Sequence, residues 1–228
     1  MYSFNTIRSK FNICGGVIDM QNQLRNNILS MSGSKNKQER EMLSRFSLYL
    51  RRHNIYFESD ITEDEISRIT ILFKNCKTCP QDVLEGCIYF HEDCMEVRVY
   101  YSELGSRICR KSVNRSELYR FLNFLHARLW PCVMDGRNGE LYQSQYLFCP
   151  RFYITEDGEF DITTAFLIPY SHYELDELQT EDFITAALPD LMISLSEPIF
   201  LILEGKITAD EAIRMAKRKI LSEANDEI

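Results

Sequence analysis

The sequence lacks several features that would place it in a functional class at once. It has no excess of positive charge, because 26 Lys and Arg stand against 34 Asp and Glu, for a formal net charge of -8. Binding of nucleic acid irrespective of sequence needs Lys and Arg to displace counterions from the phosphates, so the acidic balance argues against it. The first twenty residues also lack the apolar core and small-residue cleavage site of a secretory signal.

A long uninterrupted apolar run is missing as well. The longest apolar stretch, residues 183–203, is interrupted by Pro189, Asp190, Glu197 and Pro198, which is not the pattern of a bilayer span. We therefore expect a cytoplasmic, bacterial protein that binds neither nucleic acid nor membrane. In that setting its eight cysteines are expected to be reduced thiols that behave as small apolar side chains.

The composition supports a folded domain with an added arm. Hydrophobic residues make up 45% of the 228-residue chain and charged residues 26%, enough to build a sizeable core. Apolar residues at helical spacing over residues 17–31 precede a polar stretch at 32–37. We predict an N-terminal helical arm and linker over residues 1–37 and a single α+β domain over residues 38–228, with a C-terminal helix at 208–224 as an extension.

The clearest local pattern is a β-hairpin in residues 151–170. Asp157-Gly158 lies between two segments rich in aromatic and β-branched residues, a strong hairpin signal. A three-residue loop ending at Gly158 would pair Ile154 with Phe160 and Phe152 with Ile162. That register places the apolar side chains of the hairpin on one face, and burial of this face would enforce it: Phe152, Ile154, Phe160, Ile162, Thr164, Phe166 and Ile168.

Hydrophobic periodicity and capping signals predict the other elements. Helix and strand both fit residues 55–74, and we favour strands near 55–59 and 67–74. A helical region should run from a cap at Thr180 to Leu203, bent or broken at Pro189 and Pro198. The remaining predicted elements are a helix at 38–54, a hairpin at 86–101, a helix from Asn114 to Trp130 with Glu117 as its capping partner, a strand in 141–148, and a final helix capped by Thr208 and Glu211.

The order of these elements resembles that of the YbjN family, which shares the fold of type III secretion chaperones. The likeness is carried by the Gly86–Tyr101 hairpin, by the Asn114–Trp130 helix, and by PRFYITEDGEFDITTAFLIPY followed by Glu181–Pro198. It covers roughly residues 40–205. The resemblance implies an α+β fold with helices packed on one face of an antiparallel sheet, commonly dimeric and without catalytic residues. In the secretion chaperones such domains hold an extended partner polypeptide.

A zinc site is the sharpest chemical alternative. Cys76 and Cys79 have the Cys-x2-Cys spacing that can aim two thiolates at one tetrahedral ion. Cys87 lies far from Cys94 in the predicted hairpin, where His91 is opposite Cys94. The zinc candidates are therefore Cys76, Cys79, His91 and Cys94, and ordinary buried or loop thiols are the other interpretation of these cysteines.

No catalytic signature appears in the sequence. The four histidines are scattered without a Ser or Cys in a recognisable turn, and Gly136 and Gly139 lack the Lys-Ser/Thr of a phosphate-binding loop. We predict a non-enzymatic protein-binding module, chaperone-like or regulatory, that forms a homodimer, needs no cofactor and captures a partner polypeptide in a groove or at a sheet edge. The alternatives are a zinc-binding protein using the Cys76–Cys94 region, structural or hydrolytic, and a small-molecule-sensing regulatory domain.

Overall fold

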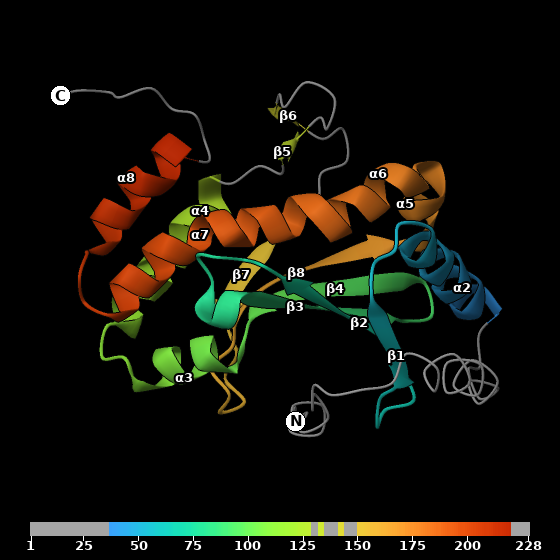
Figure 1. The fold of residues 1–228 in the computed structure, drawn as a ribbon, viewed down its shortest axis with the longest axis horizontal. Helices are drawn as coiled ribbons and strands as arrows, with labels where there is room; N and C mark the ends of the chain where they lie inside the picture. Colours follow the sequence, from blue (N-terminus) through green and yellow to red (C-terminus); the bar gives the residue numbers. More distant parts are fainter. Residues whose placement is uncertain (1–36, 129–131, 135–140, 144–149, 220–228) are drawn as a thin grey trace.

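The computed structural model describes residues 37–128, 132–134, 141–143 and 150–219. They form an α+β fold built on a six-stranded antiparallel sheet of order β1-β2-β3-β4-β8-β7, with helices packed against it (Figure 1). The strands of this sheet are β1 (Phe57–Ile61), β2 (Ser67–Lys74), β3 (Val83–Phe90), β4 (Cys94–Tyr101), β7 (Arg151–Ile154) and β8 (Ile162–Pro169). The helices are α2 (Lys37–Arg52), α3 (Glu103–Lys111), α4 (Arg115–Arg128), α5 (Tyr170–Leu175), α6 (Glu177–Asp182), α7 (Leu188–Leu203) and α8 (Ala209–Lys219). Among the described residues this confirms the predicted α+β class and the antiparallel sheet.

The hydrophobic core lies between the sheet and the helices that cover it. In β4, Met95, Val97 and Val99 alternate toward this core and are at most 1% exposed, as expected for a strand with one buried face. Figure 1 shows α7 running across the same face of the sheet. Tyr101 fixes the two layers together, because its hydroxyl donates a hydrogen bond to the Met192 carbonyl at 2.7 Å.

The last long helical region was predicted to be bent or broken at Pro189 and Pro198, and a break there is wrong. The helix is continuous from Glu177 to Leu203, and a π-helical segment (Phe183–Ala187) joins α6 to α7. The Leu188 N–H bonds to the Phe183 carbonyl, five residues back. This wider turn precedes Pro189, whose ring would crowd an ordinary α-helical turn. The cap also differs from the prediction, since the Asp176 carboxylate rather than Thr180 accepts from a backbone amide, that of Gln179.

By length and composition alone, this 27-residue helix, Glu177–Leu203, could cross a membrane. Core helices of soluble proteins meet the same criterion, and half of its apolar window is buried inside the protein. Its Met192 and Leu195 side chains are fully buried in the core. This feature is therefore weak support for a membrane span.

The register of the last hairpin differs from the prediction by two residues. Ile154 pairs with Ile162 and Phe152 with Thr164. The longer loop is closed by the Thr155 N–H bonded to the Asp161 carbonyl at 3.0 Å. A shift of two residues keeps every side chain on its face, so Phe152 and Ile154 are buried as predicted. Phe160 leaves the ladder, has φ 61° and packs under the Arg115 guanidinium.

Most other local predictions are confirmed, with shifted ends. Helices α2 and α4 and the β3–β4 hairpin occupy their predicted segments, while β1 begins two residues later than expected. Strands β5 (Cys132–Met134) and β6 (Leu141–Gln143) form a separate pair. Strand β5 and helix α3 were not predicted. Glu117 does not cap its own helix; its carboxylate accepts from the Ala209 N–H at the start of α8. The predicted helical arm at 17–31, Trp130, and residues 220–224 of the last helix lie outside the described residues.

Candidate functional site

The two edge strands of the sheet, β1 and β7, are the strands beside which another polypeptide could pair. In an antiparallel ladder, residues alternate between bonding to the partner strand and pointing their N–H and C=O groups away from it. The Thr62 N–H bonds to the Ile66 carbonyl at 2.9 Å, just beyond the last β1–β2 pair. Counting back along this register, the backbone groups of Phe57, Ser59 and Ile61 point outward from the sheet.

The outward edge of β1 is unoccupied by any backbone hydrogen bond between described residues. Its side chains divide cleanly between the two faces of the sheet. Phe57 is 8% exposed and belongs to the core, whereas Glu58 and Asp60 lie on the opposite face and are exposed. Asp60 receives the Arg68 guanidinium at 2.9 Å, so Glu58 is the less neutralised of the two acids.

A hollow of about 430 Å³ lies beside the first residue of β1. It is bordered by the chain that leads into β1, by the end of β2 and by the start of α7. Ile55, Phe73 and Ile193 give it apolar walls, and Lys74 and Asp190 add charges of opposite sign. The hollow therefore lies next to the end of β1 where Ile55 and Tyr56 lead into the strand.

The opposite edge of the sheet, at β7, is partly closed by a side chain. The Thr155–Asp161 hydrogen bond places the Phe152 amide on the outer side of β7 by the same alternation. That N–H is bonded to His126 Nε2 of α4 at 3.1 Å, and the two rings make an edge contact with centroids 6.1 Å apart. Covering an edge in this way protects it from pairing with another strand. Among the described residues, β1 is thus the more open of the two edges.

Because His126 accepts this hydrogen bond, the bond requires the neutral imidazole. Partial burial, with a smaller contribution from Arg151, lowers the pKa of His126 below its usual value of 6.5. The unfolded chain therefore takes up this proton before the folded protein does, and stability should fall as the pH drops below about 6.5. We expect His126→Gln, which keeps a neutral acceptor, to reduce the loss of stability between pH 7.5 and 5.5 by about 0.5 kcal/mol.

Urea unfolding at the two pH values would measure this difference. An unaltered pH dependence in His126→Gln would contradict the proposed role of the neutral imidazole.

The sheet face opposite the core carries a small aromatic cluster of Cys87, Tyr89 and Tyr100. The Arg68 and Arg98 guanidinium groups lie 5.8 Å and 5.0 Å from the Tyr89 ring centroid. Arg98 also makes two hydrogen bonds with the Glu96 carboxylate, at 2.9 Å and 3.0 Å. Since each guanidinium is paired with a carboxylate, this face does not offer the free positive charge of an RNA-binding sheet.

The four zinc candidates are not brought together. Cys76 and Cys79 precede β3, whereas His91 and Cys94 follow it in the hairpin turn. Eight residues of strand separate the two pairs, a distance of about 26 Å at the usual rise per residue. Among the described residues no group of three His, Cys, Asp or Glu side chains could hold a metal ion.

Each pair has a local structural role. The Cys79 N–H bonds to the Cys76 carbonyl at 2.7 Å in a tight turn, and burial raises the pKa of the Cys79 thiol to about 11. The His91 N–H bonds to the Cys94 carbonyl at 2.9 Å, so His91 is opposite Cys94 in the hairpin as predicted. Burial also raises the pKa of Cys94 to about 11.

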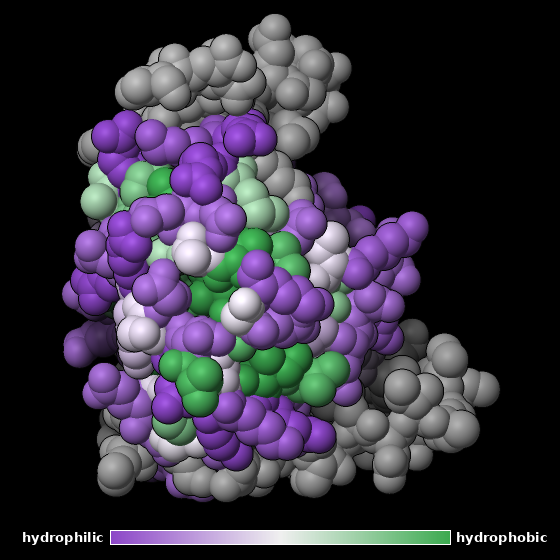
Figure 2. Space-filling model, turned by 90° about the vertical axis from the view of Figure 1, so that its left-hand side faces the viewer, coloured by the Kyte–Doolittle hydropathy of each residue, from purple (hydrophilic) through white to green (hydrophobic). Residues whose placement is uncertain are grey.

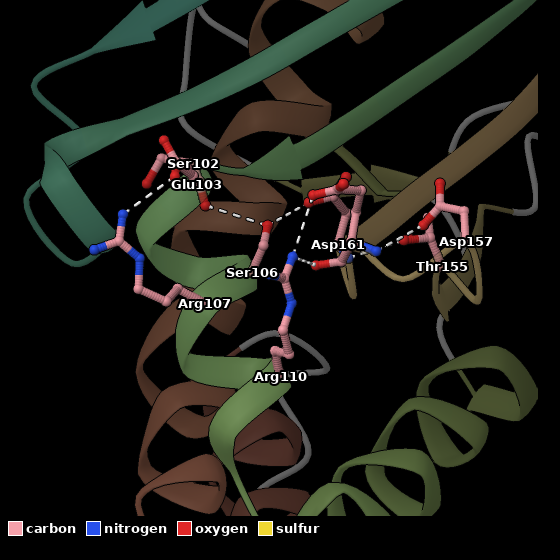
Figure 3. A network of polar contacts seen from close by, with 9 residues as sticks. Ser102, Glu103, Ser106, Arg107, Arg110, Thr155, Asp157 and Asp161 are labelled. Carbon is pink, nitrogen blue, oxygen red and sulfur yellow. Dashed lines mark hydrogen bonds and ion pairs between the residues drawn. The ribbon is translucent and has the colours of Figure 1, made fainter. Parts of the chain in front are cut away.

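Ser106 and Asp161 form a buried Ser–Asp pair, residue types that also occur in catalytic groups. Ser106 of α3 donates to the Asp161 carboxylate, and the Asp161 N–H bonds to Thr155 Oγ1 at 2.9 Å (Figure 3). Nearby, Arg110 reaches the Glu159 carboxylate at 3.2 Å. Ser106 is 1% exposed and Asp161 2%, so a substrate cannot reach them. The network joins α3 to the β7–β8 loop and is structural.

An exposed apolar surface lies at the end of the molecule formed by α3, α4 and α8. Figure 2 shows this end, where apolar side chains are divided by polar ones. Val113, between α3 and α4, is 92% exposed. Because helices form this surface, it has no outward row of backbone N–H and C=O groups for strand pairing. It is therefore a weaker candidate for polypeptide capture than the β1 edge.

Comparison of the chain with known protein families, with curated proteins and with solved structures gives no match. The functional interpretation therefore rests on the surface itself. Sequence reasoning expected a sheet edge or groove but did not identify β1. The available signal was the alternation of Phe57, Ser59 and Ile61 with Glu58 and Asp60.

Proposed function

We propose that this chain is a non-enzymatic protein-binding module of the YbjN type, with a fold like that of the type III secretion chaperones. It captures an extended segment of a partner polypeptide as an added strand alongside β1. The observation that carries this proposal is the outward row of backbone N–H and C=O groups at Phe57, Ser59 and Ile61. The partial closure of the other edge, where His126 bonds to the Phe152 N–H, supports β1 as the capture edge.

The two parts of the β1 surface would contribute in different ways. Strand addition gains affinity from backbone hydrogen bonds and selectivity from pockets for alternate side chains. Each backbone hydrogen bond adds only about 0.5–1.5 kcal/mol net, so a five-residue strand binds weakly by backbone pairing alone. The hollow beside Ile55 would bury one apolar side chain of the partner and add about 1.5–3 kcal/mol for a Leu or Ile.

Dimer formation is the second part of the proposal. Three leucines are exposed at the corner where α2 meets α5 and α6, namely Leu48 at 46%, Leu175 at 73% and Leu178 at 58%. Arg45 of α2 links these elements through ion pairs with Glu174 and Glu177. A second copy covering this corner would remove the leucines from water. Native mass spectrometry would show twice the chain mass, and a monomer at every concentration would contradict this part.

Binding of a synthetic peptide tests capture at β1. The probe is a fluorescent nine-residue peptide of alternating Ile and Lys, and its control has the same composition with the two residue types in separate blocks. Ser59→Pro removes an outward N–H and leaves the β1–β2 bonds intact. We expect fluorescence anisotropy to show at least tenfold weaker binding of the alternating peptide to Ser59→Pro than to the wild-type chain.

Ser59→Ala is the matched control, because it removes the hydroxyl but retains the amide, and it should bind as the wild type does. Equal affinity of the peptide for the wild-type chain and Ser59→Pro would exclude capture at β1. Equal affinity of the alternating and block peptides would show charge attraction without strand pairing.

A further inference from the structure

The face assignment of β1 specifies the chemistry of the strand that fits beside it. On the core side, Phe57 and Ile61 call for apolar neighbours, and Ile61 is still 39% exposed. On the opposite side, Glu58 calls for a cation, because opposite charges on neighbouring strands are stabilising and like charges are not, whereas Asp60 already receives the Arg68 guanidinium. The fitting strand therefore alternates apolar and basic residues in the same phase as β1.

A second copy of β1 does not meet this requirement. Outward backbone groups occur at Phe57, Ser59 and Ile61, so an antiparallel copy must pair these residues with one another. In the alignments that pair the most residues of the two strands, Glu58 or Asp60 of one chain lies opposite Glu58 or Asp60 of the other. Like charges would face each other across the new pair in all of these registers. The acids on β1 thus disfavour edge-to-edge pairing of two copies.

We propose that the segment Ile7–Phe11 of this same chain is an occupant of the β1 edge. The segment reads Ile-Arg-Ser-Lys-Phe and lies outside the described residues. Set antiparallel to β1, it matches apolar with apolar and basic with acidic on either side of a central serine pair: Phe11 with Phe57, Lys10 with Glu58, Ser9 with Ser59, Arg8 with Asp60, and Ile7 with Ile61. This inference rests on the proposed role of β1 as a capture edge.

The hollow favours the antiparallel direction. In that direction the chain continues past the start of β1 at Phe57 and brings Ile13 level with Ile55, which lines the hollow and whose own N–H is bonded to the Leu50 carbonyl. In the parallel direction the corresponding position is Asn5, whose polar side chain would gain less than Ile13 from burial against Ile55, Phe73 and Ile193. Burial of Ile13 thus adds a specific reason for the antiparallel arrangement.

The chain has enough length for the segment to reach its own β1. Residues 12–36 separate Phe11 from Lys37, and these 25 residues can span at most about 85 Å. The start of α2 is one helix length of about 24 Å and a four-residue connection from β1. Linkage within one chain gives an effective concentration in the millimolar range, far above that of a second copy in dilute solution. The segment from the same chain is therefore the favoured occupant.

Amide hydrogen exchange in the full chain tests this occupancy. The outward amides of Phe57, Ser59 and Ile61 should exchange slowly if they donate to the N-terminal segment. Ser9→Pro removes the amide that would bond back to Ser59, and we expect exchange at the outward amides of β1 to become at least tenfold faster. Ser3→Pro, outside the matched segment, is the control and should leave exchange unchanged.

A charge exchange tests the register. Lys10→Glu and Glu58→Lys should each speed exchange at Ser59 several-fold, since each places like charges opposite one another, and the double variant should restore the wild-type rate. Lys35→Glu makes the same charge change elsewhere in the basic N-terminal region and should have no effect. Failure of the double variant to restore the rate would overturn the Lys10–Glu58 pairing.

The results separate this inference from the proposed function. Fast exchange at the outward amides of the wild-type chain would overturn self-occupancy, while weakened binding of the alternating peptide to Ser59→Pro would still support capture at β1. Protection that increases with protein concentration would overturn the same-chain assignment in favour of a segment from a second copy. In contrast, concentration-independent protection, with tighter binding of added peptide to Ser9→Pro than to wild type, is the expected result.

Discussion

Replacing Phe46 by alanine is expected to lower the free energy of unfolding by about 3–5 kcal/mol. Phe46 is fully buried on α2, with its ring centroid 6.1 Å from that of Tyr49 and 6.4 Å from that of Phe90. Deleting the ring removes its contacts and leaves a cavity that the surrounding side chains fill only in part. For a chain of this size the loss corresponds to roughly 10–15 °C in melting temperature.

Urea unfolding followed by circular dichroism would measure this change. Ser44→Ala on the same helix is the control, because Ser44 is exposed and the change should alter stability by about 0.5 kcal/mol or less. A cost below 1 kcal/mol for Phe46→Ala would show that α2 does not hold the sheet. Since the chain passes from α2 into β1 within four residues, loosened packing of α2 should also weaken peptide binding at the β1 edge.

The parts of the fold that were predicted correctly have signals within one short segment. Helix α4 has apolar residues at helical spacing, and Leu118, Phe121 and Leu125 are buried as that spacing requires. The capping box of α8 is a similar local signal, with Thr208 N–H bonded to the Glu211 carboxylate at 2.8 Å. Such patterns depend on neighbours three or four residues away, so the sequence alone predicts them.

The features that were missed depend on pairing between distant segments. Helix α3 has a short apolar pattern, and its Ser106 is buried because Asp161, 55 residues later, accepts its hydrogen bond. The hairpin register was displaced because Phe160 packs outside the ladder with positive φ, which turn composition did not signal. The zinc hypothesis treated Cys76, Cys79, His91 and Cys94 as neighbours, and strand β3 holds the two pairs at its opposite ends.

The candidate site shows the same division. Alternation in residues 57–61 is visible in the sequence, but whether a strand is an edge depends on the order of all six strands. The outward direction of Ser59 follows only from the Thr62–Ile66 hydrogen bond. The sequence resemblance predicted capture of an extended polypeptide, and the structure adds a particular edge, a phase and a neighbouring hollow on which to test it.

Removal of the buried carboxylate of Asp161 is the second prediction with a large effect. Asp161→Ala leaves the Ser106 hydroxyl without its acceptor, and its remaining contact is the Ser102 carbonyl at a long 3.5 Å. An unsatisfied buried donor costs about 1–3 kcal/mol, and the lost hydrogen bond adds to this. We expect a total destabilisation of about 2–4 kcal/mol, measured by urea unfolding, whereas Asp161→Asn should cost less because it retains an acceptor.

A double-mutant cycle separates the lost bond from the unsatisfied hydroxyl. Adding Ser106→Ala to Asp161→Ala removes the orphaned donor, so the double variant should be less destabilised than the sum of the two single variants. Additive costs would contradict a direct Ser106–Asp161 hydrogen bond. Strands β7 and β1 are the opposite edges of the sheet, so a folded Asp161→Asn should bind the alternating peptide as the wild type does. Equal peptide affinity together with reduced stability of Asp161→Asn would show that this network holds α3 against the β7–β8 loop and takes no part in peptide capture.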